Sequence, residues 1–190
     1  MWVSRLAVAV CLLIAAAIGV VVFAASQPAI EAIAPPAPAS FDAAAVKRGA
    51  VLATIGNCDA CHTAPGGRDF AGGVAVPTPF GTVYSTNITP DGETGIGVWS
   101  EAAFLRAMRN GLRRDGAYLY PAFPYDHFTL VTDDDDKALY AFLMTRTPVH
   151  ATAPQNQLKR TAVILTGRWR RRGVTRQTSI RAYLIFCTGF

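Results

Sequence analysis

The chain has 190 residues, of which 51% are hydrophobic and 16% charged, and its formal net charge is +5. This composition is too apolar for an intrinsically disordered protein, and the length allows one modest domain with appendages, which excludes a large multidomain enzyme. Residues 159–190 hold eight Arg or Lys and no acidic residue, whereas the rest of the chain is mildly acidic. The positive charge therefore belongs to the C-terminal segment and does not indicate nucleic-acid binding.

The N-terminal segment is strongly apolar. Residues 6–25 form a run of twenty uncharged residues, about the length that a helix needs to cross the hydrocarbon core of a membrane. Arg5 precedes the run, which favours a cytoplasmic N-terminus. Small residues at positions 24–26 also resemble a signal-peptidase site, so a cleaved export signal stays open beside the favoured anchor. We expect an anchor over residues 1–26, then an extended Pro/Ala-rich linker over 27–40 on the outer side of the inner membrane.

Residues 41–158 are predicted to form one domain with three helices. The first begins after Asp42 as its N-cap and ends at Gly56. The second begins at Ser100 and ends near Gly111. The third begins at Thr132 and ends before Pro148.

Two further segments bear on the fold. Residues 133–136 are four consecutive Asp. Their carboxylates are better explained by interaction with the positive N-terminal end of the third helix dipole than by a calcium site. Residues 66–97 are rich in Gly, Pro and Thr and predict a long irregular loop. The domain is therefore expected to be all-α, with so little regular structure that something besides side-chain packing fills its centre.

The motif with the clearest chemistry follows the first helix. Cys58, Cys61 and His62 form a C-x-x-C-H sequence. Two thiols at this spacing can form thioethers with the two vinyl groups of a haem, and the adjacent histidine can then bind the iron as an axial ligand. A covalently bound haem c also supplies the apolar body that a loop-rich domain needs.

Three other interpretations of the motif compete with haem attachment. A thioredoxin-like dithiol expects a βαβ context, which the pattern lacks. A zinc site needs a second pair of ligands at suitable spacing, and the sequence has none. A structural disulfide between Cys58 and Cys61, in a haem-free adhesion or assembly module, stays open for an exported chain.

Three stretches besides the motif carry a resemblance to a known family. They are the run from Lys47 into NCDACHT, the segment PFGTVYSTNITPDGETGIGVWSE, and the segment FLRAMRNGLRRDGAYLYPAFPYDHFTLVTDDDDKALYAFL. Over about residues 41–157 the chain resembles the first haem domain of the c-type cytochrome subunits of periplasm-facing alcohol, aldehyde, gluconate and nicotinate dehydrogenases. The resemblance implies a class I-like cytochrome c fold and a role as an electron relay.

Two departures from that family concern the number of haem motifs and the C-terminal segment. Relatives often carry further C-x-x-C-H motifs, whereas this chain has one, which predicts a single haem. The likeness also stops near Lys159, where a basic segment begins that contains Trp169 and Cys187. A frameshift or truncation and a genuine basic tail on anionic lipid both remain open.

The sixth ligand of the iron is a third point of departure. The family usually supplies a Met in a Pro-x-Met-Pro loop, but the corresponding position here is Phe123, which cannot bind iron. His127 lies in the same loop and is the candidate sixth ligand, with Met108 and Met144 as alternatives. Bis-histidine ligation would lower the haem potential relative to a thioether ligand.

These observations predict an electron-transfer protein and not an enzyme. Electrons would come from a periplasmic dehydrogenase subunit and pass to a quinone or another cytochrome. The alternative is a haem enzyme or a sensor of peroxide or a diatomic gas, in which the iron is five-coordinate because Phe123 replaces the ligand.

Overall fold

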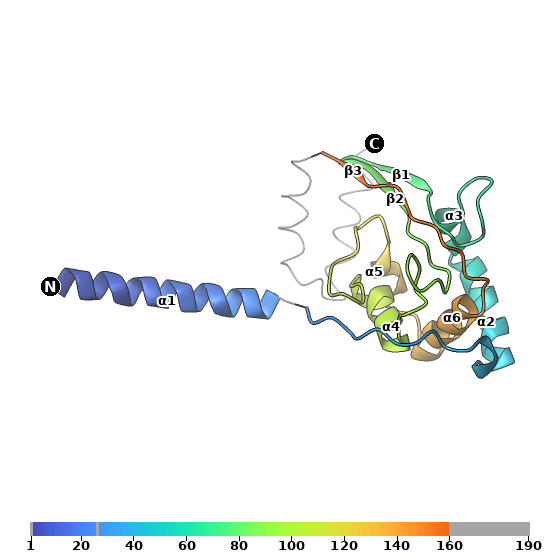
Figure 1. Cartoon of the computed structure of the whole chain (residues 1–190), viewed down its shortest axis with the longest axis horizontal. Helices are drawn as coiled ribbons and strands as arrows, with labels where there is room; N and C mark the ends of the chain where they lie inside the picture. Colours follow the sequence, from blue (N-terminus) through green and yellow to red (C-terminus); the bar gives the residue numbers. More distant parts are fainter. Residues whose placement is uncertain (1, 26, 160–190) are drawn as a thin grey trace.

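The computed structural model describes residues 2–25 and 27–159 (Figure 1). The predicted basic tail lies outside the described residues except for Lys159, whose backbone N–H donates to the carbonyl of Phe80 at 2.9 Å. The body of the described chain consists of helices joined by long loops, with a small sheet at one edge.

The N-terminal apolar run forms helix α1, Trp2–Ala25, which projects away from the other elements in Figure 1. The helix thus covers the segment predicted as an anchor. Within the part of the chain that the structure describes, however, no helix qualifies as a membrane span. The predicted transmembrane anchor is therefore not confirmed.

Two helices that are far apart in sequence form the centre of the domain. Helix α2, Ala43–Ile55, begins as predicted at Asp42, whose side chain accepts a hydrogen bond from the backbone N–H of Ala45 at 2.9 Å. Helix α6, Asp133–Met144, is capped by Thr132 and packs along α2. They approach so closely at Gly49 that a Cβ atom there would lie 2.0 Å from the carbonyl oxygen of Ala138.

Helix α4, Glu101–Asn110, also begins at its predicted cap, Ser100, and turns its buried side chains toward α6. It ends at Gly111, where a φ of 61° places the backbone in the left-handed region that glycine adopts most easily. The short helix α5, Tyr125–Phe128, contacts α4. The apolar faces of these helices meet in one core cluster with α2 and α6.

The prediction of an all-α domain is wrong in one respect, because three short strands form an antiparallel sheet. Strand β1, Ala75–Thr78, pairs with β2, Gly81–Tyr84, in a hairpin, and β2 pairs with β3, Gln157–Leu158. The hairpin lies inside the segment expected to be irregular. Thr78 stabilises its tight turn by donating its hydroxyl to the carbonyl of Gly81 at 2.6 Å and accepting from the N–H of Phe80 at 3.2 Å.

The Pro/Ala-rich segment does not leave the domain as a free spacer. Residues 27–33, which we call the strap, lie against α4 and the loop that follows it. The backbone N–H of Ile30 donates to the carbonyl of Arg114 at 2.8 Å, and the Arg106 side chain donates to the carbonyl of Pro28 at 2.6 Å. A one-turn 3₁₀ helix, η1 (Pro38–Ser40), then leads into α2. The strap is therefore held against the domain by hydrogen bonds.

Candidate functional site

The C-x-x-C-H motif forms a helical turn of its own, α3, Cys58–His62. It is separated from α2 by Gly56 and Asn57, and the φ of 54° at Asn57 lies in the left-handed region, which interrupts the helix. Cys58 packs against the core cluster, whereas Cys61 is exposed, and both cysteines are free thiols. Burial, with a smaller contribution from Asp59, raises the pKa of the Cys58 thiol to about 11.

The imidazole of His62 is oriented by a carbonyl from a distant part of the chain. Its Nδ1 lies 2.7 Å from the carbonyl oxygen of Thr86, so Nδ1 carries the proton and donates it. Burial lowers the pKa of His62, although the bond to Thr86 acts in the opposite direction, and the ring is therefore neutral at neutral pH. In this tautomer Nε2 keeps its lone pair, which is the state that a metal-binding histidine requires.

Gly72 lies close against the backbone of Thr86. This glycine has a φ of 77°, and a Cβ atom there would lie 2.5 Å from the carbonyl carbon of Thr86 and 2.6 Å from its oxygen. The backbone N–H of Gly72 in turn donates to the carbonyl of His62 at 2.7 Å. No sequence pattern indicated this arrangement, because the three residues are apart in sequence and meet only in the folded chain.

The loop predicted to hold the sixth ligand contains an aromatic pair. The rings of Phe123 and Phe128 stack with centroids 5.5 Å apart, and both pack against the core cluster. His127 lies on α5 between them in sequence and is exposed. Phe123 thus takes an apolar packing position where the family resemblance expected a ligand.

The two methionines proposed as alternative ligands belong to the packed core. Met108 lies on α4 and is 8% exposed, and Met144 lies at the end of α6 and is 1% exposed. Both belong to the same hydrophobic cluster as Leu139 and Tyr140. This environment suits a packing role for both side chains.

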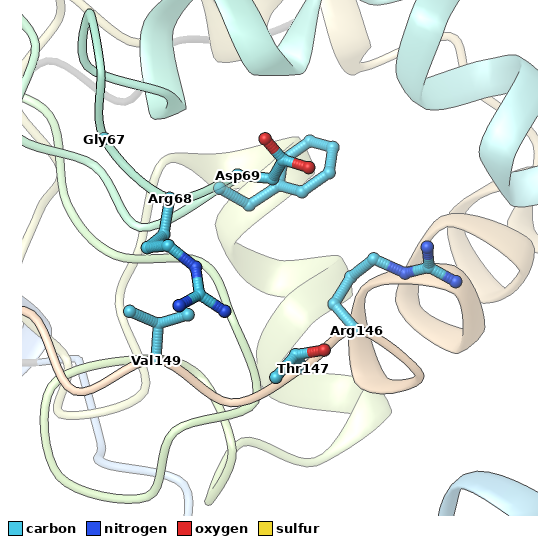
Figure 2. A pocket seen from close by; sticks show the side chains of 7 residues that line it. Gly67, Arg68, Asp69, Arg146, Thr147 and Val149 are labelled. Carbon is cyan, nitrogen blue, oxygen red and sulfur yellow. The ribbon is translucent and has the colours of Figure 1, made fainter.

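A small hollow of about 220 Å³ lies between the loop after α3 and the end of α6 (Figure 2). Arg68 lines it from the loop, and Arg146 and Thr147 line it from the segment after α6. Phe70 forms part of the wall and contacts Phe142 edge to face at 5.8 Å. The charged lining differs from the apolar walls that surround most cofactors.

The chemistry of the donor set fits a covalently bound haem c. Two free thiols three residues apart lie on one helical turn, and the next residue is a neutral histidine whose Nδ1 is already occupied. Within residues 2–25 and 27–159, no group of three His, Cys, Asp or Glu side chains is arranged to hold a metal ion. The four Asp instead lie in the first turn of α6 and pair with Arg48, Arg109 and Lys137.

Comparison with known proteins gives relatives of one kind, although no protein-family model matches the chain. The chain is 57% identical to a nicotinate dehydrogenase subunit of Pseudomonas putida over 68% of its length. It is 49% identical to the gluconate 2-dehydrogenase cytochrome c subunit of Pantoea cypripedii over 66% of its length, and 47% identical to the alcohol dehydrogenase (quinone) cytochrome c subunit of Gluconobacter oxydans over 67%.

The chain spans only part of each relative. The matched region covers 11% of the nicotinate dehydrogenase subunit, 28% of the gluconate dehydrogenase subunit and 26% of the alcohol dehydrogenase subunit. The identity levels confirm the resemblance that the sequence motifs indicated. Over about two thirds of its length, the chain is thus a homologue of the c-type cytochrome subunits of bacterial gluconate and alcohol dehydrogenases.

Proposed function

We propose that this chain is a single-haem c-type cytochrome that relays electrons from a dehydrogenase partner to the respiratory chain. Cys58 and Cys61 would hold the haem by thioether bonds, and His62 would be the axial ligand. The observation that carries the proposal is the hydrogen bond from Nδ1 of His62 to the carbonyl of Thr86. This bond leaves the lone pair of Nε2 available to bind iron, in a motif that also contains two free thiols. The cytochrome names of the relatives support it.

The residues of this chain have three tasks in that role. When bound, haem c supplies reversible one-electron chemistry at its iron. The thiols would fix the group to α3, and the Thr86 carbonyl holds the His62 ring in one tautomer and one orientation. The core cluster formed by α2, α4 and α6 contacts Cys58 and gives that thiol an apolar, largely dry environment.

His127 is the proposed sixth ligand. It belongs to α5, in the same loop as Phe123, which fills the position where the family resemblance expects the ligand. The test compares His127→Ala with Met108→Leu and Met144→Leu in the haem-loaded protein. We expect only the histidine variant to change the reduced spectrum from low spin to high spin. An unchanged low-spin spectrum in His127→Ala would exclude this histidine as the ligand.

The proposed partner is a periplasm-facing dehydrogenase, and the proposed acceptor is a quinone or another cytochrome. The relatives named as subunits of dehydrogenases support the donor. The apolar N-terminal segment supports export across the inner membrane, in either of its two predicted forms, a retained anchor or a cleaved signal. Fractionation of producing cells tests the location: the proposal requires the protein on the periplasmic side, and a cytoplasmic protein contradicts it.

The function itself is tested with the full chain produced in cells that attach haem to c-type cytochromes. We expect a low-spin spectrum that changes reversibly on reduction, no carbon monoxide adduct, and no turnover of peroxide. A high-spin iron that binds carbon monoxide readily would instead support the five-coordinate enzyme or sensor. Absence of any haem signal would refute both functions and leave the disulfide-linked module.

A further inference from the structure

The carbonyl that orients His62 belongs to a loop, and a loop carbonyl is a precise hydrogen-bond acceptor only if its peptide group is held. Strand β2 ends at Tyr84, two residues before Thr86. Thr86 itself is exposed, so its side chain does not anchor the segment in the core. The next residue, Asn87, is 3% exposed and is one of the few buried polar residues in the described chain.

The Asn87 side chain uses all of its hydrogen-bonding capacity. Its Nδ2 group donates to the hydroxyl of Thr94 at 3.0 Å and to the carbonyl of Val149 at 2.7 Å. Its Oδ1 atom accepts from the backbone N–H of Thr89 at 2.9 Å and from the hydroxyl of Thr89 at 2.7 Å. A buried amide with two donors and two acceptor positions filled is held in a single orientation.

This orientation is transmitted to the carbonyl of Thr86 through one covalent unit. The carbonyl of Thr86 and the backbone nitrogen of Asn87 belong to the same planar peptide group, so fixing the Cα atom of Asn87 restricts rotation of the carbonyl. The chain is also held just beyond Asn87, where the N–H of Ile88 donates to the carbonyl of Phe70 at 2.9 Å. The backbone of Gly72 also lies close against the same carbonyl.

We propose that Asn87 is a positioning residue for the axial histidine: its buried hydrogen-bond network with Thr89, Thr94 and Val149 holds the Thr86 carbonyl in line with Nδ1 of His62. This inference rests on the proposed function of His62 as an iron ligand. The network reaches across the domain, since Val149 lies in the segment after α6. The C-terminal part of the domain therefore helps to set the chemistry of a residue on α3.

The consequence for a bound haem concerns its reduction potential. A strong hydrogen bond from Nδ1–H makes the opposite ring nitrogen a more basic ligand, which stabilises the ferric state and lowers the potential. Loosening the Thr86 carbonyl weakens this bond. Loss of the Asn87 network should therefore raise the reduction potential, although His62 remains the ligand.

Three variants of the haem-loaded full chain test the inference. Asn87→Ala removes the centre of the network. Thr89→Val removes one hydroxyl that bonds to Asn87 and keeps the side-chain volume, whereas Thr89→Ser restores the hydroxyl. Asn156→Ala is the matched control, because its side chain accepts from the N–H of Tyr84, two residues from Thr86, but lies outside the network.

Two measurements are made on each variant. Mediated redox titration gives the potential, and NMR of the reduced protein labelled with ¹⁵N-histidine gives the rate at which Nδ1–H of His62 exchanges with solvent. We expect a higher potential in Asn87→Ala and Thr89→Val, with exchange about tenfold faster, the factor that corresponds to loss of one hydrogen bond of ordinary strength. Thr89→Ser and Asn156→Ala should match the wild type in both measurements.

The outcomes separate this inference from the proposed function. If Asn87→Ala and Thr89→Val bind haem and unfold more easily but keep the wild-type potential and Nδ1–H exchange rate, the network is only structural and the inference is wrong. If Asn87→Ala does not accumulate, the comparison of Thr89→Val with Thr89→Ser decides in the same way. If the wild-type chain binds no haem, the proposed function fails first.

Discussion

Replacing Gly49 by alanine would insert a methyl group into the crossing of α2 and α6. The new Cβ would lie 2.0 Å from the carbonyl oxygen of Ala138, 2.6 Å from its carbonyl carbon and 2.7 Å from Cβ of Phe142. Two of these three atoms belong to the backbone of α6, so rotation of a side chain cannot remove the clash. The helices would have to separate by about 1.5 Å to restore ordinary contact distances.

Two opposing terms determine the size of the effect. Overpacking a well-packed contact costs up to about 3 kcal/mol, whereas replacing glycine by alanine inside a helix gains about 1 kcal/mol. The free energy of unfolding should therefore fall by about 2 kcal/mol. For a domain of this size the midpoint of thermal unfolding should fall by roughly 10 °C.

The assay is urea and thermal unfolding of the haem-loaded protein followed by far-ultraviolet circular dichroism. Gly92→Ala is the matched control, since a Cβ there would meet the Val98 side chain at 3.8 Å, an ordinary contact distance. The control should stay within about 0.5 kcal/mol of the wild type. Equal stability of Gly49→Ala and the wild type would refute the close helix crossing.

Two further predictions concern the strap and a buried carboxylate. Arg106→Gln removes a side-chain hydrogen bond to the strap, so glutamyl endopeptidase should cleave at Glu31 faster than in the wild type. The control Arg113→Gln loses only a salt bridge with Asp115 and should not change the cleavage rate. Equal cleavage rates in both variants would contradict the docked strap. Burial raises the pKa of Asp136, although its arginine partner Arg109 lowers it. A carboxyl group with a raised pKa in the folded state stabilises the fold most at a pH below its unfolded pKa of about 4. This contribution to stability is lost as the pH rises through the raised folded pKa. Asp136→Asn should therefore gain stability relative to the wild type as the pH rises from about 4 in urea unfolding, whereas a difference that is independent of pH would contradict the raised pKa.

The three longer helices of the domain, α2, α4 and α6, could be predicted because their start signals are local, whereas the short helices α3 and α5 were not predicted. Asp42, Ser100 and Thr132 each accept a hydrogen bond from the backbone N–H three residues later, so the sequence around each cap carries the information. The hairpin of β1 and β2 escaped prediction because each strand has four residues and β1 contains Pro77. Strands this short give too few alternations to distinguish them from a Gly/Pro-rich loop.

The residues of the candidate site could be proposed from the sequence only where they are adjacent in it. Cys58, Cys61 and His62 form one motif, and their spacing alone indicated haem attachment. The partner of His62 is the backbone carbonyl of Thr86, 24 residues away. Every residue has a backbone carbonyl, so the residue type at this position gives no sign of the contact. Asn87 likewise resembles an ordinary turn residue until the fold brings Val149 beside it.

The most direct test of the central claim is the mass of the denatured protein and of its peptides, after production in cells that attach haem to c-type cytochromes. We predict that the mass of one haem stays on the peptide that contains Cys58, Cys61 and His62 after denaturation and reduction. The double variant Cys58→Ala, Cys61→Ala should lack this added mass. A wild-type chain with the mass of the bare polypeptide, or with Cys58 and Cys61 joined as a disulfide, would contradict covalent haem attachment and the electron-transfer function that rests on it.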